Sequence, residues 1–328
     1  MADEERPFGL PDDAFWGRMW SREQDLLDRV YTLPRALLAD GPRRVALDAR
    51  DSAPVGVLHY APTLHHARAP WENHALVVAL RDDDGLLLAG AAEDRLPMVP
   101  PVPPGLTEDS GHSVYRRGAD LFSRPGVPRE AGSWSVWFLL GDFTSNRVRV
   151  DLVGGPARTR APLCRRPRPA PGDPLPRFDA VMPPPREHGM ELAVPRQAGL
   201  SVGPTGELGS TGPIEVRGAA RLAWPPPGMA LPSPEEGDGP VCAPLTLLVT
   251  GSLRRGPAVL RLQVPVHEVT PGVAVAAFAV DLAAFPEVPL DAQQTLFLFA
   301  YAPGGAATGP YPLELLREED AAAPRPGD

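Results

Sequence analysis

Short stretches in which apolar and polar residues alternate recur along the chain, and this period of two predicts strands rather than helices. The clearest stretch is residues 134–140, where one face would carry Trp134, Val136, Phe138 and Leu140. Similar patterns predict strands or short extended pieces over residues 45–48, 55–60, 75–81, 86–89, 114–115, 121–122, 147–153, 214–224, 245–250, 258–264, 273–282, 295–301 and 311–316.

Turn-forming residues separate several of these stretches and predict hairpins. Asp82–Gly85 lies between two predicted strands, and Asp and Gly tolerate the positive φ of tight turns. Three consecutive aspartates also suggest calcium, but the spaced ligands and terminal Glu of an EF-hand loop are missing, which favours a plain turn. The glycines at 203, 206, 209 and 212 recur every third residue, but there are too few triplets for a collagen helix, so a loop is expected there.

One block of sequence occurs twice. Residues 118–152 resemble the start of residues 279–315: a shift of 161 positions, without a gap, superposes several identical residues, which indicates an internal duplication. The matched pairs are Asp120 with Asp281, Leu121 with Leu282, Pro125 with Pro286, Val127 with Val288, Pro128 with Pro289 and Phe138 with Phe299. We expect both copies to form the same strand–loop–strand element, with Thr295, Phe297, Phe299 and Tyr301 on the face that Trp134, Val136, Phe138 and Leu140 occupy in the first copy.

The repeated pattern predicts a mostly β protein made of two tandem antiparallel β-sandwiches. These resemble immunoglobulin-like or fibronectin-III-like modules at the level of the fold, although the Cys–Trp–Cys spacing of true immunoglobulin domains is missing. The predicted order is an N-terminal extension (1–42), the first sandwich (43–155), a Pro/Arg-rich linker (156–189), the second sandwich (190–317) and a disordered tail (318–328).

The N-terminal extension carries the one helical pattern. An amphipathic helix is expected from about Pro11 to Tyr31, with a possible break near Ser21, and Pro34 ends it or begins a short second helix over residues 34–38. Trp16 and Trp20 lie one turn apart on its apolar face. The helix would either plug the first sandwich or dock another subunit, because neighbouring tryptophans make good interface anchors.

Composition supports short strands joined by many turns, because 44 prolines and 32 glycines disfavour long helices. Every basic residue is arginine, and the net charge of −9 argues against nucleic-acid binding. Two isolated cysteines, Cys164 and Cys242, suit a reducing compartment. The acidic N-terminus and the lack of an apolar run of 18 residues predict a cytoplasmic protein without a membrane span.

Familiar catalytic and nucleotide-binding motifs are missing from the sequence, so an enzyme is not expected. One cluster could bind a metal: His59, His65, His66 and His74 fall within sixteen residues, and imidazole is the commonest side-chain ligand of zinc and copper. Glu72 could be a further ligand or orient an imidazole. Solvated or hydrogen-bonded histidines are the alternative interpretation, because the spacing matches no known metal motif.

Two hypotheses about function follow. The favoured one is a non-catalytic interaction or assembly module, an accessory subunit or scaffold that binds a protein partner or another copy of itself. The alternative is a copper- or zinc-binding protein, or an accessory protein of a metalloenzyme, that uses the histidine cluster.

Overall fold

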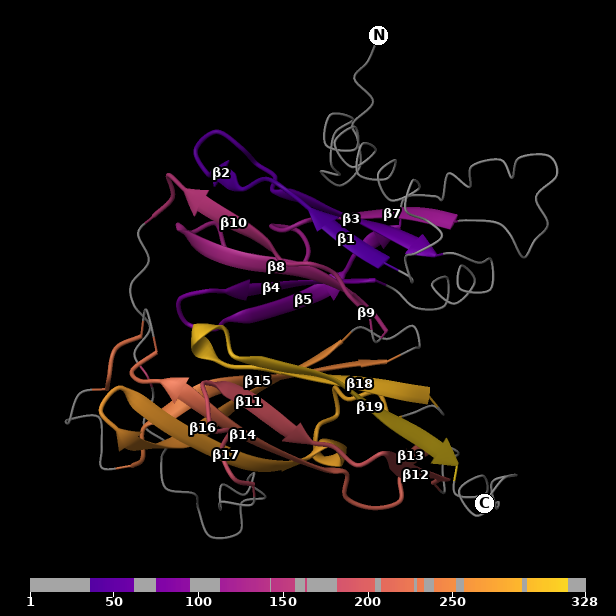
Figure 1. Cartoon of the computed structure of the whole chain (residues 1–328). Coiled ribbons are helices and arrows are strands. Elements are labelled where there is room, and N and C mark those ends of the chain that lie inside the picture. The colour runs from indigo at the N-terminus through magenta and orange to yellow at the C-terminus, as the bar shows by residue number, and fades with distance from the viewer. Residues whose placement is uncertain are drawn as a thin grey trace, which may run out of the picture. The chain divides into compact units, whose positions relative to one another are not determined.

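The computed structural model describes residues 36–61, 75–94, 113–141, 143–156, 163, 182–203, 208–226, 229–232, 239–251, 257–290 and 294–317. These residues are mostly β and contain no α-helix. Their strands fall into two compact units, the first built from β1 to β10 and the second from β11 to β19 (Figure 1).

The first unit has two sheets. One has the order β1-β3-β7-β6, and the other has the order β2-β10-β8-β4-β5, with β9 beside β8. All neighbours are antiparallel except β2 and β10, which run parallel. The strands are β1 (Ala36–Asp40), β2 (Arg44–Ala46), β3 (Pro54–Ala61), β4 (Leu76–Arg81), β5 (Leu87–Ala91), β6 (Glu93–Asp94), β7 (Ser113–Asp120), β8 (Gly132–Leu140), β9 (Phe143–Thr144) and β10 (Val148–Val153).

The second unit repeats this order of pairings in two layers joined by one long strand, β16. Residues 258–265 of β16 pair with β15 in one layer, and residues 266–270 pair with β17 in the other. The elements are β11 (Gly189–Ala193), β12 (Gln197–Val202), β13 (Leu208–Ser210), β14 (Glu215–Ala223), β15 (Cys242–Gly251), β16 (Ala258–Thr270), β17 (Val273–Asp281), β18 (Gln294–Tyr301), β19 (Ala307–Arg317) and the 3₁₀ turns η5 (Leu282–Ala284) and η6 (Pro303–Gly305).

The shared strand order is that of immunoglobulin-like sandwiches. In each unit the first strand pairs antiparallel with the third or fourth, and a short second strand pairs parallel with the last. The layers therefore correspond to the A-B-E-D and G-F-C-C′ sheets of that fold. This topology agrees with the expected β-sandwiches.

The same aspartate contact appears once in each unit. Asp120 ends β7, and its Oδ1 accepts hydrogen bonds from the backbone N–H groups of Ala53 and Phe122 at 2.9 and 3.2 Å. Asp281 ends β17, and its Oδ1 accepts from Ile214 and Ala283 at 2.7 and 3.0 Å. In both units the carboxylate ties the strand end to the residue that precedes its partner strand.

Beyond these aspartates the strands β8 and β18 differ by one residue in their alignment, so the expected match of their faces is wrong. In β8, Trp134 and Val136 lie opposite Val150 and Val148 of β10. Arg149, which alternates with these two valines in β10, is more exposed than either of them. In β18 the core cluster instead contains Leu296, Leu298 and Ala300, while Thr295 and Phe297 are only half-buried. Because side chains alternate along a strand, a shift of one residue exchanges the faces. Phe138 and Phe299 therefore lie on different faces.

Several local predictions can be compared directly with the strands. The turn at Asp82–Gly85 is confirmed: it joins β4 and β5, Gly85 has a φ of 71°, and Leu86 N–H donates to Asp84 Oδ1 at 3.2 Å. The short helix over residues 34–38 is wrong where it can be checked, because β1 begins at Ala36, ahead of the expected start of the sandwich at residue 43. Residues 121–122 form a turn rather than an extended piece, and the expected loop at 203–212 contains β13.

Candidate functional site

A groove lies in the second unit, where the chain crosses from one sheet to the other between β11 and β12. The last pair of β11 is Ala193 with Arg217 of β14, and the first pair of β12 is Gln197 with Glu314 of β19. Pro195 lies between them and has no N–H to continue a ladder. The backbone therefore leaves one sheet at Val194 and joins the other, which opens a gap along its path.

The opposite wall of the groove is the connection between β13 and β14. Thr211 donates to the carbonyl oxygen of Gly199 through its N–H at 3.0 Å and through its hydroxyl at 3.3 Å. The hydroxyl of Ser210 donates to the carbonyl oxygen of Gly212. At the end of this wall, the Asp281 carboxylate holds the N–H of Ile214. These bonds hold the connection between β13 and β14 in place.

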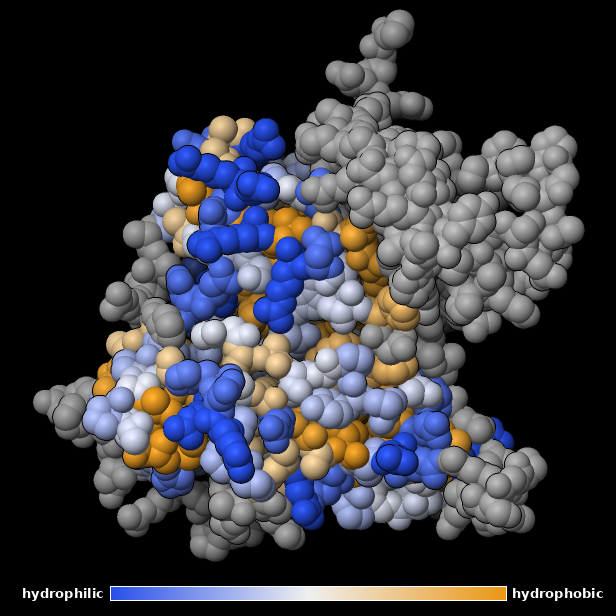
Figure 2. Space-filling view, in the orientation of Figure 1, coloured by the Kyte–Doolittle hydropathy of each residue, from blue (hydrophilic) through white to orange (hydrophobic). Residues whose placement is uncertain are grey.

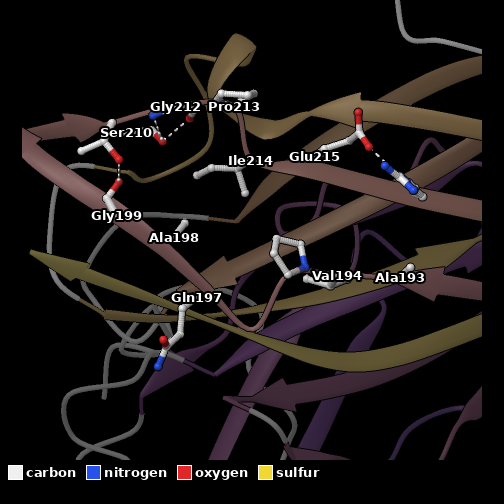
Figure 3. Close-up of a pocket in the computed structure, with 13 residues that line it drawn as sticks. Ala193, Val194, Gln197, Ala198, Gly199, Ser210, Gly212, Pro213, Ile214 and Glu215 are labelled. Atoms are coloured by element: carbon white, nitrogen blue, oxygen red, sulfur yellow. Dashed lines mark hydrogen bonds and ion pairs between the residues drawn. The ribbon is translucent and has the colours of Figure 1, made fainter. Parts of the chain in front are cut away.

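Between these walls is an open cavity of about 530 Å³, which is within the range of small-ligand and peptide pockets. Most of its lining residues have small side chains, and the buried Ile214 is among them. Figure 3 shows Ala198, Val194 and Ile214 around the central space, with Ser210 and Gly212 above it. Such a lining offers shape and backbone polar groups rather than reactive side chains.

The charged side chains of the groove neutralise one another. Arg217 Nε donates to Glu215 Oε1, and both side chains are partly exposed. At the other end, Gln197 Nε2 donates to Glu314 Oε2 at 2.9 Å. The lining residues contain no nucleophile with a neighbouring base and no pair of carboxylates. Glu215, the carboxylate among the lining residues, is paired with Arg217.

On the face that Figure 2 shows, groups of apolar residues lie among polar ones. Among the described residues, three large apolar side chains are about half exposed or more: Val202 at 61%, Leu231 at 54% and Val269 at 49%. Single exposed apolar residues of this kind are normal on soluble proteins.

The predicted site residues are mostly outside the part that the structure describes. His65, His66, His74, Glu72, Trp16 and Trp20 all lie there. The backbone of His59 is in β3, where it pairs with Leu37 of β1 and Tyr115 of β7. Within the described ranges, no group of three His, Cys, Asp or Glu residues could hold a metal ion. The histidine hypothesis stays a prediction.

Sequence reasoning missed the groove. It left residues 190–213 without strands, although Met190–Ala193 alternates in burial and Pro195 interrupts the pattern. A proline between two short alternating stretches is the signal that could have indicated a strand changing sheets.

The sequence matches no protein-family model and no curated protein. A search of solved structures finds a chain from "Crystal structure of Dpr2 Ig1-Ig2 in complex with DIP-Theta Ig1-Ig3", at 11% identity over 86% of this chain and 100% of that one. The TM-score is 0.18, and at that score the likeness carries no argument about this chain. No helix in the described ranges has the length and apolar character needed to span a membrane.

Proposed function

We propose that the protein is a non-catalytic interaction module, an accessory subunit or scaffold, and that the groove of the second unit is where a protein partner binds. The observation that carries this proposal is the groove at the crossing from β11 to β12. It is open and of ligand size, and it is lined by backbone, small side chains and one internally neutralised ion pair. Such a surface suits a polypeptide better than a substrate that needs acid or base chemistry.

We further infer that the two sandwiches arose by internal duplication. The equal order of pairings supports this, as do the matched contacts of Asp120 and Asp281. Leu121 and Leu282 are both fully buried directly after these aspartates, and Val127 and Val288 are buried six residues later. A duplicated scaffold of this kind offers two related surfaces that can diverge in what they bind. We infer that it acts in the cytoplasm, a reducing compartment that suits two isolated cysteines in the sequence, Cys164 and Cys242.

Binding through the groove can be tested by filling it. Gly212 lines the groove, has no neighbour within 4 Å of an added Cβ and does not need a positive φ. A Gly212→Trp variant should therefore fold and occlude the space. Gly209→Trp is the matched control, because Gly209 is equally open but does not line the groove.

The measurement is co-purification of the tagged full-length protein from the cells that produce it, with partner stoichiometry read by mass spectrometry and size exclusion. We expect a partner at about one copy per chain, at least tenfold reduced by Gly212→Trp and retained by Gly209→Trp. A strictly monomeric protein without a stoichiometric partner would overturn the interaction function. A partner retained by both variants would overturn the groove as its site.

The same purified protein tests the metal alternative. Elemental analysis that finds about one copper or zinc per chain, lost when His59, His65, His66 and His74 are changed to alanine, would replace the proposal with a metal-binding function. We expect no stoichiometric metal.

A further inference from the structure

One residue of the predicted linker belongs to the hydrophobic core of the second unit. Leu163 is only 1% exposed and is part of the same cluster of buried residues as Trp224 and Met229. Its N–H donates to the carbonyl oxygen of Ala230 at 2.8 Å. The second unit therefore holds both the side chain and the backbone of Leu163, well before β11 begins at Gly189.

The segment that receives Leu163 is a turn after β14. The Met229 N–H donates to the carbonyl oxygen of Pro226 at 3.1 Å, and the turn is followed by Ala230, which offers its own carbonyl oxygen to Leu163. A buried N–H without an acceptor is costly, so burial of the leucine side chain and the backbone hydrogen bond support each other. The next residue, Leu231, is instead 54% exposed.

The last described residue of the first unit lies a short way before this contact. The carbonyl oxygen of Pro156 accepts a hydrogen bond from the Ala131 N–H at 3.4 Å. Gly155 lies so close to the Leu47 side chain that an added Cβ would collide with it. Residues 157–162 alone separate these contacts from Leu163. The seven peptide units from residue 156 to residue 163 reach at most about 25 Å when fully extended.

We propose that Leu163 is an anchor that pins the linker to the second unit in solution, so that residues 157–162 are the whole tether between the two units. A free linker over the predicted range, 156–189, would reach about 100 Å at roughly 3.1 Å per residue in an extended Pro-rich chain. The anchor shortens that reach about fourfold. The inference goes beyond the proposed function and depends neither on the groove nor on the identity of a partner.

The residue before the anchor reduces the entropy cost of holding it. Position 162 is a proline, whose φ is restricted in the free chain as well, so less conformational freedom is lost when Leu163 docks. A short tether keeps each sandwich at a high effective concentration for any molecule that the other sandwich has bound. The anchor therefore limits the distance over which the two sandwiches can act together.

Amide hydrogen exchange of the full-length protein, read residue by residue by NMR, tests the backbone contact. The Leu163 N–H should exchange at least a hundredfold more slowly than expected for an unstructured chain of the same sequence. Leu163→Ala should reduce the protection at this position at least tenfold, because the buried side chain no longer holds the backbone in place. Exchange of the wild-type amide at the unstructured rate would overturn the proposal.

Spin labels test where the linker lies. One label is placed on the native Cys164, which directly follows the anchor, and the other on a Leu231→Cys variant, next to Ala230. Cys242 is buried and should not react. Electron paramagnetic resonance should give one narrow distance distribution, and Leu163→Ala in this background should at least double its width. A broad distribution with Leu163 intact, or equal widths in the two proteins, would overturn the anchor.

Thermal unfolding tests the contribution of the side chain. Leu163→Ala should lower the melting temperature of the full-length protein by several degrees, as expected when a buried leucine is truncated. Leu231→Ala is the matched control and should leave the melting temperature unchanged, because this leucine is largely exposed. Scanning calorimetry measures both variants. Equal melting temperatures of Leu163→Ala and the wild type would show that the core does not hold Leu163 and would overturn the proposal.

Discussion

At the scale of single residues, the aspartates that end β7 and β17 accept equivalent backbone hydrogen bonds in the two units. Asp281 Oδ1 accepts two backbone hydrogen bonds, one of them from Ile214, which is buried and is among the residues that line the groove. The carboxylate therefore links the end of β17 to the wall of the candidate site. Asp281 therefore affects both the stability of the second unit and the geometry of the groove.

Replacing Asp281 with alanine should destabilise the protein by about 1–3 kcal/mol, because a part-buried N–H loses its acceptor. Asp281→Asn keeps a side-chain oxygen and should recover about half of that loss. Urea unfolding followed by tryptophan fluorescence measures both variants. Equal stability of the alanine variant and the wild type would show that the contact contributes nothing.

Asp151 gives a prediction about pH. A hydrogen bond from Ser133 lowers the pKa of this carboxyl below its ordinary value, burial opposes the shift, and Arg149 adds to the lowering. A lowered folded-state pKa favours the ionised form, so the stabilisation is present above the unfolded pKa and is lost as pH falls through the folded one.

The side chain is substantially exposed, so the effect should be about a few tenths of a kcal/mol. Wild type should exceed Ser133→Ala in unfolding free energy near pH 6, and the difference should shrink as the pH falls below the ordinary aspartate value of 3.8. Urea titrations at the two pH values check this. A difference that grows on acidification would contradict the assignment.

At the scale of elements, the packing of β14 against β17 depends on a missing side chain. A Cβ on Gly218 would collide with the ring of Phe278, a core residue on the neighbouring strand. At the corresponding position of the first unit, Val57 takes the place of the glycine and lies opposite Arg117. Each pair is therefore matched within its own unit.

Gly218→Ala should therefore destabilise the protein by about 1–3 kcal/mol through overpacking. Phe278→Leu introduced alongside it should restore part of the loss, because it removes the ring atoms that collide. Gly209→Ala, at an open position, is the control and should be neutral. Thermal unfolding compares the wild type, Gly218→Ala, the double variant and Gly209→Ala. A Gly218→Ala variant as stable as the wild type would show that β14 and β17 can move apart without loss of stability.

At the scale of the whole molecule, the N-terminal extension carries the two tryptophans that we expect to anchor it to the first sandwich or to another chain. Two neighbouring indoles at Trp16 and Trp20 would expose several hundred Å² of apolar surface if uncovered, which monomers rarely tolerate. The prediction that they are covered, by the first sandwich or by another chain, lies outside the described residues.

The double variant Trp16→Ala, Trp20→Ala should lose thermal stability by several degrees or lose an oligomer, depending on which surface covers the indoles. Scanning calorimetry and size exclusion distinguish the two outcomes. Phe8→Ala, in the same extension but outside the predicted helix, is the matched control. If neither thermal stability nor oligomeric state changes, the prediction that this helix docks through Trp16 and Trp20 is wrong.

The sequence by itself determined the β character, the main strands and the tight turns. Alternation of side chains and the Asp-Gly turn are local properties, so β4, β8 and the hairpin at Asp82–Gly85 could be predicted from neighbours in the chain. The strand matches around Asp120 and Asp281 were also visible, because both residues act within a few positions of a strand end.

Tertiary structure alone decided which face each strand buries and where the candidate site opens. The faces of β8 and β18 differ because one residue of register reverses every side chain, and register is set by pairing with distant strands. The edge of β1 is closed at Ala39 by the side-chain amide of Asn146, which lies 107 residues away in the sequence. Contacts at such separations leave no periodic signal in the sequence, so only the folded chain shows them.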